Sequence, residues 1–360
     1  MTIAQQIGQR HESVENAMRL GQFGQLVKCL MLGGAGQFGN AEVAAKSRNV
    51  WPEVRKIIES GSWDSKAAQS SLTLSGGLSD YSLLANSFLD SLSSATIFDQ
   101  LLPSMTKVPV VSATIGSIAI GASGFSVSES SIKPLGRLTF ATQQSITPQK
   151  AHCLVAVSKE LARSMDPAAL NFVIRQLRLA VSVQTDAAFI STITSGVSTI
   201  TSSGTNAQAI KNDISNMLQA MTTGSDSKLF FVTTPLVAKM LTTILSDQSP
   251  TFAAVTPLGG TLAGLPLLVS DGVTTGQLLL IDAGGLAGNI GELFLQTVED
   301  AFVQQDTAPD SPPTASTIMQ SFYSLNQVGI RCERFFVTAK LRSDAVQIIQ
   351  TTNSYTGGSP

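Results

Sequence analysis

Charged residues are scarce in this chain. Lysine, arginine, aspartate and glutamate make up 13% of its 360 residues, about half of the usual share. Serine, threonine and glutamine supply much of the polar surface instead. A surface with few charges is thinly protected against self-association. Two interpretations therefore stay open from composition alone: a weakly charged soluble enzyme, or a subunit whose surface is mostly covered by its neighbours.

Three further absences exclude whole classes of protein. The formal net charge is −2, so the chain as a whole has no basic field for binding nucleic acid. No run of 18 apolar residues occurs, so we expect no transmembrane segment and no membrane partner. The first residues lack the basic-then-apolar order of a signal peptide.

Cysteine and histidine are too few and too scattered for common catalytic or metal sites. Cys29, Cys153 and Cys332 are odd in number and match neither a zinc spacing nor a disulfide framework, so a reducing cytoplasm is the simplest compartment. A Ser-His-Asp or Cys-His system would need His11 or His152. Neighbouring residues of a strand point to opposite faces, so His152 cannot pair directly with Cys153.

No other catalytic, cofactor or metal motif is present. The chain lacks a GxSxG elbow, a Walker loop and a dinucleotide-binding fingerprint. The glycine-rich residues 284–291 are interpreted as a structural turn. Glu292, Glu299, Asp300 and Asp306 have no metal-ligand spacing and are interpreted as a solvated rim of the domain that precedes them. We therefore expect no catalytic residue, cofactor or metal.

The strongest positive signal is a long amphipathic helix. Asp166 is a good N-cap, and Pro167 suits the first helical turn. The apolar residues that follow lie on one helical stripe: Leu170, Val173, Ile174, Leu177 and Val181. A helix from Pro167 to about Thr192 would be about 39 Å long, which is long enough to support other elements along its length.

Other segments predict a mixed fold. Short helices are expected within residues 1–66, docked on this subunit or on a neighbour, and a helix from Tyr81 to about Ile97. After the long helix, strands and helices alternate, which indicates an α/β domain with a central sheet. Strands are expected at 228–233, 262–270 and 277–282, an exposed Pro-rich loop at 306–316, and further strands within 321–350 that return to the long helix. Helices are expected at 206–221, capped by Thr205 or Asn206, and at 235–245, capped by Thr234-Pro235.

Residues 107–153 predict a long, bent, two-stranded ribbon. Its tip is expected near Ser123 to Gly136, where glycine and serine are frequent. A lone two-stranded ribbon is marginally stable in water. Something outside the ribbon must therefore cover it.

The order of several short motifs resembles the major capsid protein of tailed bacteriophages, with its Hong Kong 97-type fold. In that family a Ser-x-Glu-Leu helix start leads into a spine helix that ends in an Asp-x-x-Phe turn, and an Arg-led strand with an aromatic precedes an x-Asp-Ala-x strand. The matching residues here are Ser158, Glu160, Leu161, Asp186, Phe189, Arg331, Phe335, Asp344 and Ala345. The resemblance extends over residues 73–350.

The resemblance implies an α+β fold with named parts. They are an N-terminal helical arm and connector (1–80), a peripheral-domain helix (81–106), an extended β-ribbon loop (107–153), the peripheral domain with its spine helix (154–200), an α/β axial domain (201–316), and peripheral return strands with a C-terminal tail (317–360). In the family the extended loop lies across an adjacent subunit. By the same resemblance Glu129, Lys133 and Arg137 are candidate intersubunit contacts; no covalent cross-link is carried over to Lys133.

The resemblance also implies a function. The chain would assemble with itself into pentamers and hexamers of an icosahedral shell around double-stranded DNA. A portal, and scaffold or decoration proteins, would be further partners, and the location would be the virion, assembled in the bacterial cytoplasm. Two alternatives stay open: an encapsulin-like compartment that packages enzymes, and a divergent α/β hydrolase or transferase.

Overall fold

The structure is a computed structural model. The residues that it describes are 18, 21–29, 50–52, 54–55, 58, 92, 96–111, 113–120, 126, 129, 139–164, 167–204, 206–224, 226–246, 249–304, 306, 310 and 312–351. The chain divides into two compact units. Unit 1 comprises residues 1–93, 152–181 and 293–334, and unit 2 comprises residues 94–151, 182–292 and 335–360.

A long helix, α7 (Pro167–Thr194), has residues in both units. Its 28 residues correspond to a rod of about 42 Å, so the predicted helix is confirmed and ends two residues later than expected. Val173, Ile174, Leu177 and Val181 are buried as predicted. Asp166 and the side chain of Leu170 lie outside the described residues.

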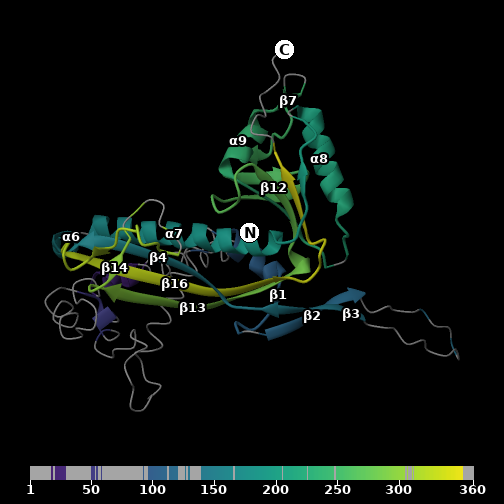
Figure 1. Ribbon diagram of the computed structural model, residues 1–360. Coiled ribbons are helices and arrows are strands. Elements are labelled where there is room, and N and C mark those ends of the chain that lie inside the picture. The colour runs from purple at the N-terminus through teal and green to yellow at the C-terminus, as the bar shows by residue number, and fades with distance from the viewer. Residues whose placement is uncertain are drawn as a thin grey trace, which may run out of the picture. The chain divides into compact units, whose positions relative to one another are not determined.

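Four strands form a sheet that also has residues in both units (Figure 1). Their order is β1 (Thr106–Lys107), β13 (Leu286–Val298), β16 (Gln327–Lys340) and β4 (Gln149–Ser158). Strand β4 leads directly into α6 (Lys159–Ser164), as predicted. The Ser158 hydroxyl accepts a hydrogen bond from the Leu161 N–H at 3.2 Å, which explains the Ser-x-Glu-Leu helix start physically.

In unit 1 the N-terminal helices pack on the body of the same chain. The residues described at 21–29 and around Val54 are helical. Phe23, Val27, Val54 and Ile58 share one buried cluster with Leu177 of α7 and Val328 of β16. The expected docking on this subunit is therefore confirmed for these residues, whereas the expected helix at 41–46 lies outside the described residues.

Unit 2 contains a seven-stranded sheet with two helices. Its strands, in spatial order, are β5 (Thr199–Thr201), β17 (Val346–Gln350), β12 (Gln277–Asp282), β6 (Leu229–Thr233), β11 (Leu265–Val269), β10 (Gly259–Leu262) and β9 (Val255–Thr256). The helices are α8 (Ala207–Ala220) and α9 (Pro235–Thr243). The predicted strands at β6 and β12 and both helices are confirmed.

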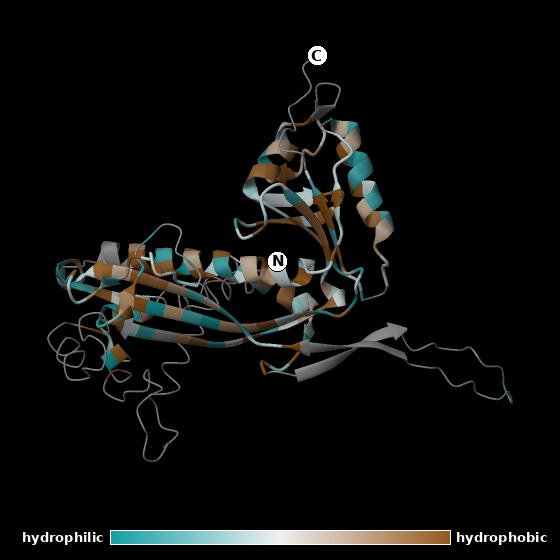
Figure 2. Cartoon of the chain, in the orientation of Figure 1, coloured by the Kyte–Doolittle hydropathy of each residue, from teal (hydrophilic) through white to brown (hydrophobic). Residues whose placement is uncertain are grey.

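Strand β12 lies inside this sheet, antiparallel to both β6 and β17. Leu279 and Ile281 belong to one hydrophobic cluster, and Leu278 and Leu280 belong to another. Alternate side chains therefore enter two cores, one on each face of the sheet, which explains why the strand is a continuous apolar run. Figure 2 shows these central strands as largely hydrophobic, whereas α8 carries both hydrophilic and hydrophobic residues.

Both helices begin at a side-chain N-cap, Asn206 for α8 and Thr234 for α9. The Asn206 side chain accepts a hydrogen bond from the Ala209 N–H at 2.8 Å, at the start of α8. The Thr234 hydroxyl accepts one from the Val237 N–H at 3.4 Å, and Pro235 occupies the first position of α9. These pairings satisfy N–H groups that would otherwise lack a partner in the first turn.

Several expectations about strands were wrong. The single strand expected at 262–270 is a hairpin of β10 and β11 in which Leu262 pairs with Leu265. Ala263 and Gly264 have φ of 50° and 80°, the positive values that a tight two-residue turn requires. Strand β5 lies in a Ser/Thr-rich segment after α7 and was not predicted. Strand β17 pairs with β12 and β5, so it belongs to the α/β sheet rather than to the return strands of the other sheet.

Two further segments also differ from expectation. A helix was expected to end at Ile97, but α5 (Ile97–Leu101) begins there, because extended Thr96 accepts a hydrogen bond from the Asp99 N–H; a 3₁₀ turn, η1 (Leu102–Ser104), follows. The glycine-rich segment is a turn only at η2 (Ala283–Gly285). The rest of it is the start of β13.

The predicted two-stranded ribbon is confirmed for β2 (Ala113–Ile120) and β3 (Thr139–Ile146). They pair antiparallel with two irregularities in register. Strand β4, which was expected in the ribbon, instead pairs with β16, and only Ser126 and Glu129 of the expected tip are described. Two small pairs complete the described strands: β7 (Leu245–Ser246) with β8 (Ser249–Pro250), and β14 (Phe302–Val303) with β15 (Gln320–Ser321).

None of the helices in the described part of the chain combines the length and apolarity that a membrane span requires.

Candidate functional site

His152 is exposed on β4, and the neighbouring Cys153 is half-buried; His11 lies outside the described residues. Among the residues that are described, no group of three His, Cys, Asp or Glu side chains is placed to hold a metal ion.

The four carboxylates that follow the α/β segment are spread over both units. Glu292 is the last residue of a unit 2 segment, whereas Glu299, Asp300 and Asp306 belong to unit 1. The Glu299 carboxylate lies 3.3 Å from Lys159 Nζ, and the other three residues are exposed. The expectation of a single rim on the α/β domain was wrong. Strand β13 has residues in both units, so Glu292 belongs to one unit and the three carboxylates after the strand belong to the other.

The three cysteines contact one hydrophobic cluster in unit 1. Their separation in sequence had concealed this. Burial is the main cause that raises the pKa of the Cys332 thiol to about 12, and the nearby Cys153 and Glu333 raise it further. Burial also raises the pKa of Cys153. Both thiols therefore stay protonated near neutral pH, which suits core packing and disfavours nucleophilic chemistry.

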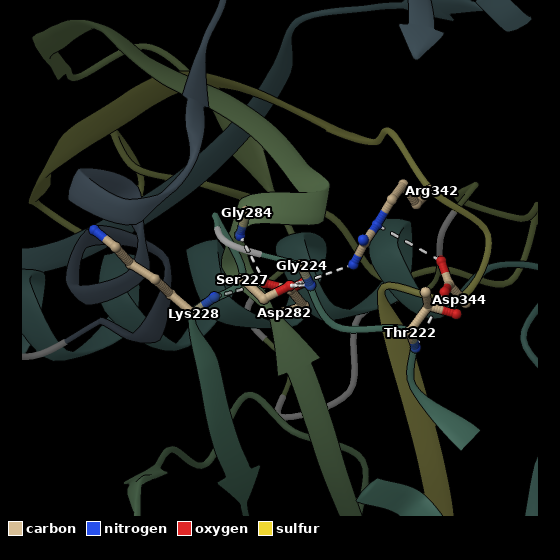
Figure 3. A network of polar contacts seen from close by, with 8 residues as sticks. All are labelled: Thr222, Gly224, Ser227, Lys228, Asp282, Gly284, Arg342 and Asp344. Carbon is tan, nitrogen blue, oxygen red and sulfur yellow. Dashed lines mark hydrogen bonds and ion pairs between the residues drawn. The ribbon is translucent and has the colours of Figure 1, made fainter. Parts of the chain in front are cut away.

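A dense polar network in unit 2 is centred on Asp282, at the end of β12 (Figure 3). Its carboxylate is buried. Oδ1 accepts hydrogen bonds from the backbone N–H groups of Lys228 at 2.8 Å and Gly284 at 3.0 Å. Oδ2 accepts from the Ser227 hydroxyl at 2.7 Å and from Arg342 Nη2 at 2.5 Å. Every charge-bearing oxygen of this buried carboxylate is therefore paired.

The same network extends outward through Arg342. Its Nε lies 3.7 Å from the Asp344 carboxylate, which in turn accepts a hydrogen bond from the Thr222 N–H at 3.3 Å. Figure 3 shows Arg342 between the two carboxylates. A Cβ at Gly285 would lie 2.6 Å from Ala345 Cβ, so the turn after β16 lies directly against the end of β12. The network fixes that turn, and with it the entry of the chain into β17.

Sequence reasoning named Asp344 but missed Asp282 and Arg342. A local signal for Asp282 was available, because an acidic residue that ends an apolar strand before Gly-Gly is well placed to accept turn N–H groups. Its partner Arg342 is 60 residues away along the chain, and no local pattern links the two.

A second buried carboxylate, Asp186 of α7, joins three segments of unit 2. Its Oδ1 accepts hydrogen bonds from the N–H groups of Ile97 at 2.9 Å and Phe98 at 3.2 Å, which begin α5. Its Oδ2 accepts from the Ser270 hydroxyl at 2.6 Å, just after β11. Burial raises the pKa of Asp186 to about 6, although these hydrogen bonds oppose the rise.

Phe189 packs against α5, the short helix whose first N–H groups donate to Asp186. Its ring meets that of Phe98 edge-on, with centroids 5.3 Å apart at 61°, and Phe98 also contacts Phe336 of β16 at 5.2 Å. The Asp-x-x-Phe motif thus has a physical basis: one residue holds the first turn of α5 by hydrogen bonds, and the other packs against its side chain.

The three predicted intersubunit residues are not brought together by the described structure. Glu129 is exposed, whereas Lys133 and Arg137 lie outside the described residues. Their grouping stays a prediction.

Unit 1 exposes large apolar side chains along one small ribbon. Phe302 is 69% exposed on β14, and Ile318 and Tyr323, on either side of β15, are 75% and 79% exposed. With Met319 and Leu325 these residues are called the β14–β15 patch. Phe322 between them is fully buried, so neighbouring residues of this segment divide between the core and the surface. Scattered apolar residues are ordinary on surfaces, but several on one ribbon indicate a contact surface.

The chain is similar to known capsid proteins of bacteriophages. A family model of phage capsid proteins matches residues 144–349. The capsid polyprotein of Pseudomonas phage PAJU2 is 30% identical over an alignment of 274 residues, which covers 70% of this chain and 40% of that protein. The chain therefore spans less than half the length of this curated relative.

A solved phage structure has the same overall fold. A chain from Gordonia phage Cozz is 17% identical, covers 80% of this chain and 98% of its own length, and superposes with a TM-score of 0.51. A chain from Mycobacterium phage Ogopogo is 15% identical, covers 70% and 91%, and has a TM-score of 0.44. Because the family model covers more than half of its residues, the chain belongs to the phage capsid protein family.

Proposed function

We propose that this chain is a major capsid subunit that assembles with itself into an icosahedral shell around viral double-stranded DNA. The observation that carries the proposal is the family match over residues 144–349, which includes α7 and every strand of the seven-stranded sheet except the last residue of β17. Identical subunits would form rings of five and six through heterologous contacts. Each contact can be weak because every subunit makes many of them.

The finer architecture is part of the proposal. We assign α7, with the four-stranded sheet, to the peripheral domain of a Hong Kong 97-type fold, and the seven-stranded sheet with α8 and α9 to its axial domain. The β2–β3 ribbon is the extended loop that lies on a neighbouring subunit. Two observations support this last assignment: the ribbon is a separate two-stranded sheet, and such a ribbon is marginally stable without a cover.

The contact surfaces between copies include the β14–β15 patch. Its apolar side chains are accessible in the single chain, and burying them against a neighbour would contribute about 25 cal/mol per Å² of apolar area. The scarcity of charge also supports a surface that is covered after assembly.

Partners other than the chain itself follow from the proposed role. They are a portal, scaffold or decoration proteins, and DNA bound without sequence preference through its phosphates. The role is structural, with no catalytic step and no cofactor. The location is the virion capsid, after assembly in the cytoplasm of the bacterial host.

Sedimentation velocity of the full chain, expressed alone in bacteria and purified, tests this function. We expect a rapidly sedimenting species of very many subunits, or rings that convert to it when a scaffold protein is supplied. A uniform oligomer of a few subunits that never converts would favour an enzyme instead. Nucleic acid within particles from infected cells would support the capsid, whereas a protein cargo there would contradict it.

A further inference from the structure

Two segments close around the carboxylate of Asp186. One is the start of α5, whose first two N–H groups donate to Oδ1. The other is the segment after β11, where the Ser270 hydroxyl donates to Oδ2. A Cβ at Gly272 would lie 2.7 Å from the Asp186 Cβ, so this second segment lies directly against α7. The side chain of Asp186 is fully buried, so water does not solvate it.

The network can accommodate both protonation states of the carboxyl group. When Asp186 is ionised, both oxygens accept, and the Ser270 oxygen accepts in turn from the Gly272 N–H at 3.1 Å. When Asp186 is protonated on Oδ2, this oxygen can donate to the Ser270 oxygen, whose own hydrogen then rotates away from the carboxyl group. Oδ1 still accepts from Ile97 and Phe98. Neither state requires the three segments to separate.

The two states nevertheless differ in free energy. Burial disfavours the ionised form and is the main reason that the pKa of Asp186 is raised from 3.8 to about 6. The charged group that faces Asp186 from the packed elements is Asp99 of α5, and its negative charge raises the pKa further. The hydrogen bonds from Ser270, Ile97 and Phe98 act in the opposite direction.

We propose that Asp186 is a proton-responsive latch within unit 2: the neutral carboxyl holds α7, α5 and the segment after β11 together more tightly than the ionised carboxylate does. Mild acid therefore strengthens this joint, and neutral pH loosens it. The proposal concerns the single subunit and does not depend on shell assembly.

The direction of the pH dependence follows from linkage. Opening of the joint exposes Asp186 to water, where its pKa returns toward 3.8, whereas the closed joint has a pKa of about 6. The closed state therefore binds the proton more tightly, and its extra stability is fully present below pH 3.8 and is lost as pH rises to about 6. The opening constant should rise about a hundredfold across this interval and stay level above it.

Hydrogen exchange of the full chain, followed by mass spectrometry between pH 4 and 7.5, measures this opening. The informative peptide covers residues 97–101, and its rates are corrected for the intrinsic pH dependence of exchange. We expect wild-type protection to fall as pH rises toward 6 relative to Asp186→Asn. Asparagine resembles the neutral carboxyl group and cannot ionise, so this variant supplies the reference.

Two neighbouring substitutions sharpen the test because they should move the midpoint in opposite directions. Ser270→Ala removes a hydrogen bond that lowers the pKa of Asp186, so its midpoint should shift upward. Asp99→Asn removes a like charge, so its midpoint should shift downward. A purely structural role for these residues would change protection at all pH values alike.

The proposal is overturned if wild-type and Asp186→Asn profiles are parallel across the pH range, or if both neighbouring variants keep the wild-type midpoint. If Asp186→Asn does not fold, the opposite shifts of Ser270→Ala and Asp99→Asn against wild type decide the question. The two proposals are tested separately. Sedimentation could contradict the capsid function while hydrogen exchange supports the latch, and hydrogen exchange could contradict the latch while sedimentation supports the capsid function.

Discussion

At the scale of residues, buried carboxylates hold unit 2 together at three places. Asp186, Asp213 and Asp282 are each buried, and each accepts hydrogen bonds from a serine hydroxyl and from at least one backbone N–H group. In a chain with few charges, these carboxylates accept hydrogen bonds from the N–H groups of turns and helix starts inside the fold, and they do not add charge to its surface. A buried carboxylate is tolerated when its oxygens are paired in this way.

Asp282→Ala should destabilise the chain by about 3 kcal/mol, because it removes the buried partner of the partly exposed Arg342 and leaves the N–H groups of Lys228 and Gly284 without an acceptor. Asp344→Ala is the matched control on the same arginine: Asp344 is partly exposed, so its loss should cost about 1 kcal/mol or less. Urea unfolding of both variants measures the difference. Equal losses would show that the network does not centre on Asp282.

Residue-level features could be predicted where their partners are close in sequence. Ser158, Asn206 and Thr234 cap helices through N–H groups three residues away, and a local pattern contains that information. Asp186 reaches N–H groups 88 and 89 residues away. Its motif could be recognised from the sequence, but its partners and its shifted pKa depend on tertiary packing.

At the scale of elements, α7 supplies part of the core of each unit. In unit 1 it contributes Val173, Ile174 and Leu177 to the cluster that also holds β16 residues. In unit 2 it contributes Phe189 and Ile193 to a second cluster. One helix thus takes part in two cores, and a charge introduced at one of its buried positions should be far more damaging than one introduced at an exposed position.

Leu177→Asp should abolish soluble folded protein, because an unpaired buried carboxylate costs several kcal/mol. Leu179→Asp, on the same helix, is the control: Leu177 is 0% exposed and Leu179 is 53% exposed, so the second change should alter stability by about 1 kcal/mol or less. Thermal melting and soluble yield compare the two. Similar behaviour of both variants would refute the assigned buried face of α7.

Elements with a clear period or caps were predictable, whereas short strands were not. The stripe of α7 and the apolar run of β12 each specify their element. Strand β5 has three exposed residues, and it is a strand because β17 runs parallel to it. The hairpin of β10 and β11 was missed because the apolar run through Leu262 and Leu265 conceals a two-residue turn.

At the scale of the whole molecule, the proposed function depends on surfaces that a single chain leaves uncovered. The β14–β15 patch is accessible, yet its buried neighbour Phe322 packs against Gly329, where a Cβ would lie 2.6 Å from the Phe322 ring. Neighbouring residues of one turn therefore have two different roles, in the core and on the surface. Phe322 maintains the fold, and the exposed members are available to a second copy.

The double substitution Ile318→Ser and Tyr323→Ser should leave the melting temperature of the subunit within a few degrees of wild type. It should raise the protein concentration at which assembly begins at least about tenfold, because apolar contacts between copies are lost. Light scattering against concentration measures this. Phe322→Ala is the contrasting variant and should lower melting of the subunit by cavity formation. Assembly of the double variant at wild-type concentration would remove the patch from the proposed interface.

The most direct test of self-assembly is a negative-stain electron micrograph of the full-length protein beside a variant in which residues 123–136 are replaced by an Asn-Gly turn, which suits a two-residue hairpin. The wild type should form closed shells. The shortened protein should melt like wild type when disassembled but form only isolated rings or single subunits. Closed shells from the shortened protein would contradict the ribbon as an intersubunit clamp, and a small uniform particle from the wild type would contradict the capsid function itself.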